Sequence, residues 1–198
     1  MRPIVLFLAL PALALAACGQ EAETPAEEAG NAANEQPGSG PIGEAPAVPI
    51  VDADGTILGE VQAGDSAQGA VLRISAQGLP AGTHGVHIHD VGLCEGPTFE
   101  SAGPHWNPET KKHGTQNPEG PHRGDLPNLT VGEDGRLQGT MTIEASNLTG
   151  SRAYGFANTI LDENGAALVI HAQPDDYKTD PSGNSGDRIA CAVLGAPG

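Results

Sequence analysis

The sequence predicts an all-β domain, an eight-stranded antiparallel Greek-key β-barrel or sandwich with large loops. Three observations lead to this fold class. Gly and Pro are abundant, with 28 and 17 residues, while aromatic residues make up only 3% of the chain. Such a composition divides a chain into short strands and turns around a small core. No helical spacing of apolar residues persists, and about eight runs have the residue types of short strands.

The first four strand-like runs are separated by turn signals. Residues 47–51 end close to Asp54-Gly55, a hairpin signal, and residues 56–61 follow it. Residues 70–76 alternate between two sets of side chains, as expected of a strand, and residues 83–89 form the next run.

Four further runs follow a long loop. Residues 90–127 are dense in Gly, Pro and His and have almost no strand pattern; the later runs are residues 128–131, 136–144, 167–171 and 189–194. A structureless loop of about 40 residues is abnormal in a compact domain unless it is functional or cross-linked. Something other than a hydrophobic core is therefore expected to hold this loop.

The first 17 residues are typical of an export signal. An apolar stretch, residues 4–17, follows Arg2 and is shorter than the about 20 residues that a membrane span needs. It ends in LAAC (residues 15–18), which resembles the bacterial lipobox, where the chain is cut before the cysteine and lipid is attached to its thiol. We therefore predict a lipoprotein signal peptide over residues 1–17 and lipidation of Cys18. The alternative is an ordinary signal peptide cut near Ala17.

Residues 18–45 are predicted to form a lipidated, disordered acidic tether before a domain that spans residues 46–198. The tether segment has almost no large apolar side chain, so it cannot bury enough surface to offset its ordering entropy. The chain has a net charge of -16, and the domain alone keeps 19 acidic and 8 basic side chains. This balance speaks against nucleic acid or anionic lipid as a partner, because phosphate contacts need clustered Lys and Arg.

The seven histidines suggest metal binding. His87 and His89 lie in one strand-like run and project from the same side, although such a pair alone is equally compatible with a structural role. The long loop adds three imidazoles and a carboxylate, a complete tetrahedral zinc set, and His171 adds a further nitrogen. Imidazole suits both copper and zinc, so ligand type does not choose the metal. Surface histidines in a polar loop are the alternative, disfavoured because all seven fall in or beside these motifs.

Five segments resemble copper/zinc superoxide dismutases of the exported bacterial lipoprotein type. They are GTHGVHIH (residues 82–89), SAGPHWNP (101–108), KHG (112–114), HRGDL (122–126) and GNSGDRIAC (183–191). The resemblance covers residues 47–194, with the motifs in the family's order. It implies long metal-binding and electrostatic loops on the barrel, with one copper and one zinc per subunit.

Carried over position by position, the resemblance implies two ligand sets that share one histidine. The copper ligands are His87, His89, His105 and His171; the zinc ligands are His105, His113, His122 and Asp125. It also implies that Asp175 joins His87 to His113, an outer contact that fixes ring orientation. The alternative for Asp175 is a turn residue after Pro174.

The remaining cysteines, Cys94 and Cys191, are expected to form a disulfide that joins the long loop to the last strand. An exported chain with two cysteines besides the lipidated one most simply pairs them. A free-thiol role is the alternative.

The function that the resemblance implies is disproportionation of superoxide to dioxygen and hydrogen peroxide by redox cycling of copper. Arg188 is expected to neutralise the anion beside copper, and His105 to carry a proton; a structural Arg188 paired with Asp187 is the alternative. Two rival functions remain: a non-enzymatic copper/zinc-binding envelope lipoprotein on the same scaffold, and a zinc-free, copper-only dismutase. The complete zinc set argues against the second rival.

The expected partners are superoxide as substrate and the membrane through the lipid anchor only, in the cell envelope or periplasm. Monomer and homodimer are both left open, because residues 95–100 and 171–188 depart from the eukaryotic layout. An acidic domain with an anionic substrate needs a local positive patch. Besides Arg188, the candidate sources are Lys111, Lys112 and Lys178.

Overall fold

The computed structural model describes residues 46–150 and 152–198. The predicted signal peptide, the lipidation site Cys18 and the predicted tether of residues 18–45 lie outside the described residues. Within the described ranges, no helix has the length and apolar character needed to cross a membrane.

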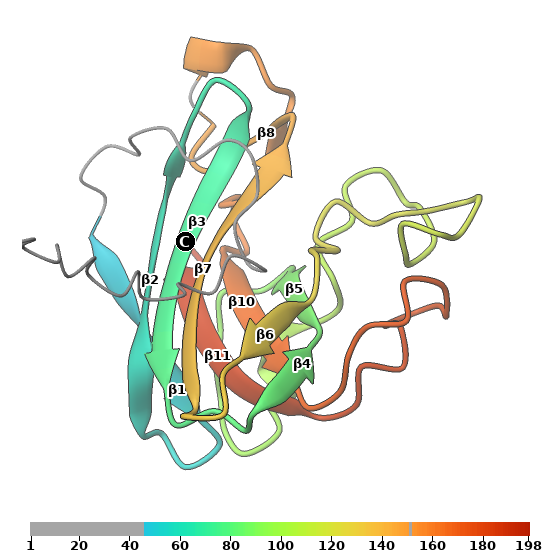
Figure 1. Cartoon of the computed structure of the whole chain (residues 1–198). Coiled ribbons are helices and arrows are strands. Elements are labelled where there is room, and N and C mark those ends of the chain that lie inside the picture. The colour runs from blue at the N-terminus through green and yellow to red at the C-terminus, as the bar shows by residue number, and fades with distance from the viewer. Residues whose placement is uncertain (1–45, 151) are drawn as a thin grey trace, which may run out of the picture. The chain divides into compact units, whose positions relative to one another are not determined.

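Seven strands form one curled sheet in which every pair is antiparallel (Figure 1). In sheet order they are β5 (Val86–His89), β10 (Ala166–His171), β11 (Arg188–Gly195), β1 (Ala47–Asp52), β2 (Ile57–Asp65), β3 (Gly69–Gln77) and β7 (Arg136–Glu144). The last strand, β11, returns beside the first, β1, as Greek-key connections require. The prediction of an all-β antiparallel fold is confirmed.

The remaining elements are short. They are β4 (Gly82–His84) paired with β6 (Leu129–Val131), β8 (Ser146–Asn147) paired in parallel with β9 (Asn158–Thr159), and the 3-10 turns η2 (Glu100–Ala102) and η3 (Arg152–Tyr154). The described residues contain no α-helix. Every predicted run corresponds to at least one strand, and the short β8–β9 ladder is an addition that the sequence did not predict.

The predicted run 83–89 differs from the structure because Gly85 interrupts it. The backbone N–H of Gly85 donates to Gln173 O at 2.8 Å, and Gly85 O accepts from His171 N at 2.9 Å. The strand therefore changes partner at this glycine, pairing with β6 before it and with β10 after it. This change of partner brings the end of β10 against β5, where the functional site lies.

The main core packs against one face of the sheet. Alternate residues of β3 and β7 point into it, including Leu72, Ile74, Leu137 and Met141, each at most 3% exposed. Side chains alternate between the two faces of a strand, and all six residues of β10 are buried. Both faces of β10 are therefore covered. Leu168 and its even-numbered neighbours join the main core, whereas the odd-numbered Ala167 and Val169 face a second, smaller apolar cluster.

The long loop, residues 90–127, is held by backbone pairing and a disulfide. Its segments around Trp106 and Gly124 lie along β5, where Ile88 N donates to Gly124 O at 2.9 Å and Trp106 N donates to Ile88 O at 2.7 Å. Cys94 in the loop is bonded to Cys191 in β11, which confirms the predicted disulfide. Closing a chain segment of 97 residues contributes about 4–5 kcal/mol in the chain-entropy account.

Candidate metal centre

Four buried histidines meet where β5 and β10 lie side by side. His87 and His89 point from β5 to the same side, and His171 ends β10. His105 comes from the long loop and forms an isolated β-bridge with His89. All four are at most 7% exposed, and the ring centroids of His87 and His105 are 3.9 Å apart.

Each of these four imidazoles has one ring nitrogen held by an oxygen acceptor. The pairs are His87 Nε2 with Asp175 Oδ2 at 3.0 Å, His89 Nδ1 with Gly103 O at 2.9 Å, His105 Nδ1 with Asp125 Oδ1 at 2.9 Å and His171 Nδ1 with Gly186 O at 3.1 Å. For His87, His89 and His171 these contacts fix which nitrogen remains available, whereas the held nitrogen of His105 faces Asp125 and the second set of ligands.

The other nitrogen of each ring is buried and has no hydrogen-bond partner among the described residues. These atoms are His87 Nδ1, His89 Nε2, His105 Nε2 and His171 Nε2. A buried polar atom without a partner costs about 1–3 kcal/mol, so four in one place fit the binding of a metal ion at this point. One ligand atom from each residue lies within 4.8 Å of the others. Four imidazole nitrogens around one point fit copper.

The carboxylate of Asp125 gathers the second set. Its Oδ1 lies 2.9 Å from His105 Nδ1, 3.0 Å from His113 Nδ1 and 3.2 Å from His122 Nδ1. Its Oδ2 accepts from the backbone N–H groups of Gly114 and His122, both at 2.9 Å. Three imidazole nitrogens within 3.2 Å of one carboxylate oxygen are the donor types of a tetrahedral zinc site.

One geometric grouping of possible ligands differs from the predicted zinc set. It combines His87, His105, His113 and Asp125, and so has His87 where the prediction has His122. His87 Nε2 is already held by Asp175, and its Nδ1 belongs to the copper-side group. His122 Nδ1 is buried and makes no hydrogen bond within the described residues, which leaves it available for a metal.

Asp175 lies between the two groups of histidines. Its Oδ2 accepts from His87 Nε2 at 3.0 Å and its Oδ1 from His113 Nε2 at 2.9 Å, with the aspartate only 3% exposed. The structure therefore places Asp175 where the resemblance implies it, joining a ring of one set to a ring of the other. Burial opposes its charge, but hydrogen bonds from these two rings lower the pKa of Asp175 below its usual value.

The histidines differ in their preferred protonation without metal. Burial lowers the pKa of His105 to about 4 and that of His171 to about 3, so both are neutral near pH 7. For His113, burial is outweighed by hydrogen bonds to Asp125 and Asp175, which raise the pKa to about 9. The copper-side nitrogens are thus ready to bind a cation, whereas His113 must lose a proton first.

Metal-depleted protein is expected to be most stable near neutral pH. The folded-state pKa of His105 and of His171 lies below the value of 6.5 expected when unfolded. Stability is therefore lost as pH falls from 6.5, by about 3 kcal/mol for His105 once pH reaches its folded pKa. The raised pKa of His113 acts in the opposite sense: its contribution is full below pH 6.5 and is lost as pH rises through about 9. Urea unfolding across this range measures the effect, and stability that rises steadily on acidification would contradict it.

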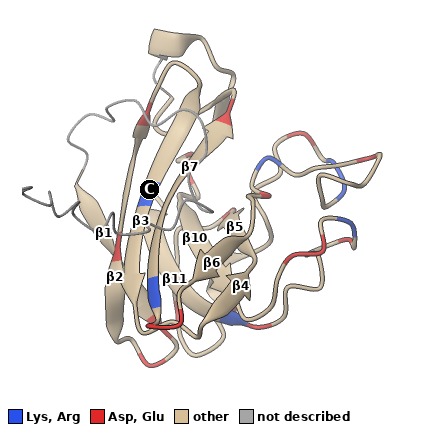
Figure 2. Cartoon of the chain, viewed as in Figure 1, with Lys and Arg blue, Asp and Glu red and all other residues tan. Residues whose placement is uncertain are grey.

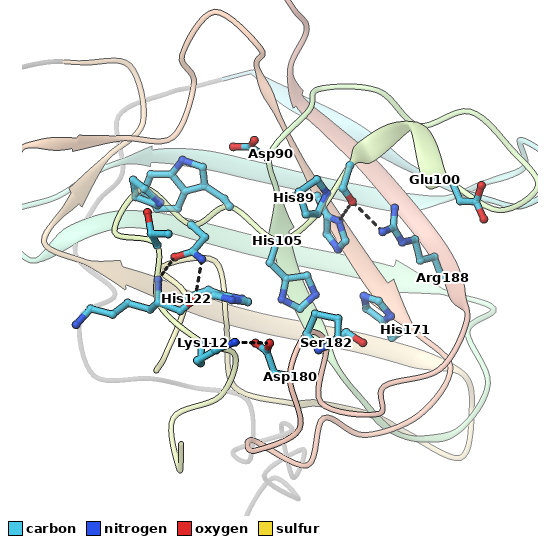
Figure 3. Close-up of a pocket in the computed structure, with 18 of the residues that line it drawn as sticks. His89, Asp90, Glu100, His105, Lys112, His122, His171, Asp180, Ser182 and Arg188 are labelled. Atoms are coloured by element: carbon cyan, nitrogen blue, oxygen red, sulfur yellow. Dashed lines mark hydrogen bonds and ion pairs between the residues drawn. The ribbon is translucent and has the colours of Figure 1, made fainter. Parts of the chain in front are cut away.

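A cavity of about 1050 Å³ opens over the copper-side nitrogens. His89, His105, His171 and Arg188 line it and are labelled near one another in Figure 3. Arg188 Nη1 donates to Phe99 O at 2.6 Å and Nη2 to Gly103 O at 2.8 Å. Among the described residues Arg188 forms no ion pair, with Asp187 or any other acid. Burial lowers the pKa of Arg188, but a guanidinium keeps its proton at any ordinary pH.

The other basic residues contribute unequally to this cavity. Lys111 and Lys112 line it, although Lys112 Nζ lies 3.4 Å from Asp180 Oδ2 in an exposed ion pair; Lys178 is not among the described lining residues. Five carboxylates also line the cavity: Asp90, Glu100, Glu119, Asp162 and Asp180. Figure 2 shows basic and acidic residues mixed along the long loops. Arg188 is the basic residue whose charge acts on His89 and His171.

Three contacts at the site have no counterpart in the sequence analysis. Phe99 and Gly103 hold Arg188 through backbone carbonyls, which carry no signal of residue type. Asp180 Oδ1 accepts a hydrogen bond from the backbone N–H of His113 at 2.8 Å. Asp180 lies in a turn, and its distance along the sequence from the histidines matches no recognisable motif. Gly103 has a positive φ of 73°, a conformation that glycine adopts without strain. The glycine itself is the one sign of these contacts that the sequence contains.

Several curated proteins are similar to this chain. It is 41% identical over 146 residues to a protein of Aquifex aeolicus named superoxide dismutase [Cu-Zn] 2, covering 73% of this chain and 83% of that protein. It is 40% identical over 200 residues to a superoxide dismutase-like protein of Bacillus subtilis, covering 98% of this chain and 96% of the other. A superoxide dismutase [Cu-Zn] of Caulobacter vibrioides is 37% identical over 142 residues, covering 71% of this chain and 80% of that protein.

Solved structures show the same fold. A double mutant of the superoxide dismutase-like protein from Bacillus subtilis, in which a tyrosine and a proline are replaced by histidine, superposes with a TM-score of 0.69 and 47% identity. The match covers 75% of this chain and 97% of that one. The Cu/Zn superoxide dismutase from Brucella abortus has a TM-score of 0.57 and 25% identity, covering 77% of this chain and all of that one.

Residues 53–194 match the family model described as copper/zinc superoxide dismutase. This range includes every residue of the two histidine groups, Asp175, Arg188 and both cysteines of the disulfide. The chain therefore belongs to the copper/zinc superoxide dismutase family.

Proposed function

We propose that this chain removes superoxide in the bacterial cell envelope, converting two superoxide anions and two protons to dioxygen and hydrogen peroxide. One observation carries the proposal. Four buried imidazoles each present one free nitrogen to the same point, next to the unpaired guanidinium of Arg188. A metal ion and an anion can therefore meet at the floor of the cavity.

Copper bound by His87, His89, His105 and His171 supplies a one-electron redox couple, so that one superoxide is oxidised to dioxygen and the next is reduced to peroxide. Arg188 provides a fixed positive charge that attracts each anion and orients it at the cavity floor. Its two hydrogen-bond acceptors are neutral carbonyls, and Glu100 is the acid whose charge acts on it from the cavity wall.

His105 is the residue placed to handle a proton. Its Nδ1 faces Asp125, while its Nε2 belongs to the four free nitrogens beneath the cavity. A proton held at Nε2 lies where the second superoxide needs one to leave as peroxide. The set of His113, His122 and Asp125 holds zinc in this proposal, and so fixes the other side of the His105 ring.

The proposal is tested by measuring superoxide decay with the copper- and zinc-loaded protein, with the same protein after copper removal, and after copper is restored. The expected rate constant approaches the about 10⁸–10⁹ M⁻¹s⁻¹ known for superoxide dismutases, and it disappears and returns with copper. Zinc-only protein is the matched control. A protein that binds one copper but, once free copper is removed with a chelator, accelerates decay no more than the zinc-only control would instead be a metal-binding protein without dismutase activity.

We also propose that the mature chain is anchored by lipid on Cys18 and carries its domain on the acidic tether of residues 18–45. The support is the LAAC sequence at residues 15–18 and the composition of the segment that follows. The anchor keeps the enzyme in the envelope, where superoxide made outside the cytoplasm is accessible to it.

Replacing Cys18 by alanine is expected to release an active, soluble protein from the membrane fraction. The metal ligands all lie beyond residue 86, so the change leaves copper and zinc content as in the wild type. Fractionation of cells followed by metal analysis and an activity assay measures both consequences. If the variant remains with the membranes, or loses its metals, the proposed anchor is wrong.

A further inference from the structure

A second apolar cluster lies on the face of β10 and β11 opposite the main core. Its buried members are Phe99, Ala102, Ala167, Val169 and Cys191, with Val51 and Cys94 packed against it. Phe99 is the largest of them and is fully buried. The cluster therefore attaches the segment of the long loop that precedes Gly103 to the strands that carry His171 and Arg188.

Phe99 is an unusual residue to find in this turn. Its backbone is left-handed, with φ of 54°, a conformation that favours glycine or asparagine. Its N–H donates to Glu95 O at 3.0 Å, and its carbonyl accepts from Ala102 N at 3.1 Å. The turn is thus closed on both sides of Phe99, and the burial of its ring keeps an unfavourable backbone conformation in place.

The carbonyl of Phe99 is turned towards Arg188 by this conformation. Arg188 Nη1 donates to it at 2.6 Å, while Nη2 donates to Gly103 O at 2.8 Å. Gly103 O also accepts from His89 Nδ1 at 2.9 Å. Two carbonyls, one at each end of the short segment Phe99–Gly103, therefore set the direction of the guanidinium. Of these two residues, only Phe99 has a large buried side chain.

We propose that Phe99 is the positioning residue of Arg188: its ring, seated in the second apolar cluster, holds the carbonyl that orients the guanidinium towards the copper-side cavity. The proposal rests on the proposed function only in giving Arg188 an anion to attract. The disulfide Cys94–Cys191 belongs to the same cluster and anchors the loop five residues earlier. Phe99 differs from the disulfide in that its own carbonyl contacts Arg188.

The test measures anion affinity at the copper site, independently of turnover. Copper- and zinc-loaded protein is titrated with azide, and binding is followed by the change in copper absorption. Phe99→Ala is expected to bind azide about tenfold more weakly, the scale of one hydrogen bond to a charged group. Phe99→Leu, which refills most of the cluster, is expected to restore most of the affinity. Copper and zinc content stay unchanged in both.

A matched control separates positioning from loss of stability. Leu137→Ala empties a fully buried site of the main core on β7, and it is expected to lower the melting temperature but leave azide affinity as in the wild type. If Leu137→Ala weakens azide binding as much as Phe99→Ala, or if Phe99→Ala leaves it unchanged, the proposal is wrong.

A double-mutant cycle shows whether Phe99 acts through Arg188. In an Arg188→Ala background, Phe99→Ala is expected to cause no further loss of azide affinity, because the group that it positions is absent. Additive losses would overturn the proposal. These measurements also separate the proposed function from the proposed role of Phe99. A wild-type protein that binds azide but does not remove superoxide refutes the proposed function, and the double-mutant cycle still tests whether Phe99 positions Arg188.

Discussion

Replacing His171 by alanine is expected to abolish superoxide turnover while zinc stays bound. His171 Nε2 is one of the four free nitrogens, and its Nδ1 contacts Gly186 O, so the residue has no contact with Asp125. The loss of activity should exceed the about 10- to 100-fold loss that follows when a residue hydrogen-bonded to a metal ligand is replaced. Decay of superoxide and metal analysis of the purified variant measure the two consequences.

The matched variant, His122→Ala, is expected to have the opposite metal profile. His122 lies 3.2 Å from Asp125 Oδ1, and its own N–H binds Asp125 Oδ2 at 2.9 Å. Zinc should be lost, the long loop should loosen and the melting temperature should fall, because metal binding is coupled to folding. Equal loss of both metals in His171→Ala and His122→Ala would contradict the division into a catalytic and a structural set.

Replacing Arg188 by glutamate is expected to lower kcat/KM by about 10- to 1000-fold, the range by which focused fields raise association rates. The domain has 19 acidic and 8 basic side chains, so it repels superoxide at long range and depends on local positive charge. Glutamate reverses that charge next to the free nitrogens. Arg188→Lys should lose much less, because lysine keeps the charge and loses only the paired contacts to Phe99 O and Gly103 O.

Salt dependence distinguishes attraction from a local structural effect. The wild-type rate should fall as ionic strength rises, since screening shortens the field to about 8 Å at physiological salt. Arg188→Glu should lose this dependence or reverse it, with copper content as in the wild type. A glutamate variant that keeps wild-type kcat/KM with full copper would show that Arg188 does not guide the substrate.

The strands and the ligand types were predictable because local patterns encode them. Alternation of side chains identifies β3, and the spacing of His87 and His89 places two imidazoles on one face of a strand. The pairing of Cys94 with Cys191 followed from the cysteine count of an exported chain. Assignment of the metals came from the family resemblance, since imidazole binds both copper and zinc.

Features that depend on distant backbone were not predictable. The interruption at Gly85 arises because the backbone of Gln173 and His171, more than 80 residues away, takes its hydrogen bonds. The short β8–β9 ladder has two residues in each strand, too few to show alternation. Arg188 is held by hydrogen bonds to the backbone carbonyls of Phe99 and Gly103. Every residue has such a carbonyl, so the sequence does not indicate which ones bind Arg188.

The two-set arrangement of ligands is tested most directly by diffraction from the copper- and zinc-loaded protein at the absorption edges of both metals. Copper is expected among His87 Nδ1, His89 Nε2, His105 Nε2 and His171 Nε2. Zinc is expected at about 2.0–2.2 Å from His105 Nδ1, His113 Nδ1, His122 Nδ1 and Asp125 Oδ1. Zinc bound by His87 in place of His122, or copper outside the four free nitrogens, would contradict the account.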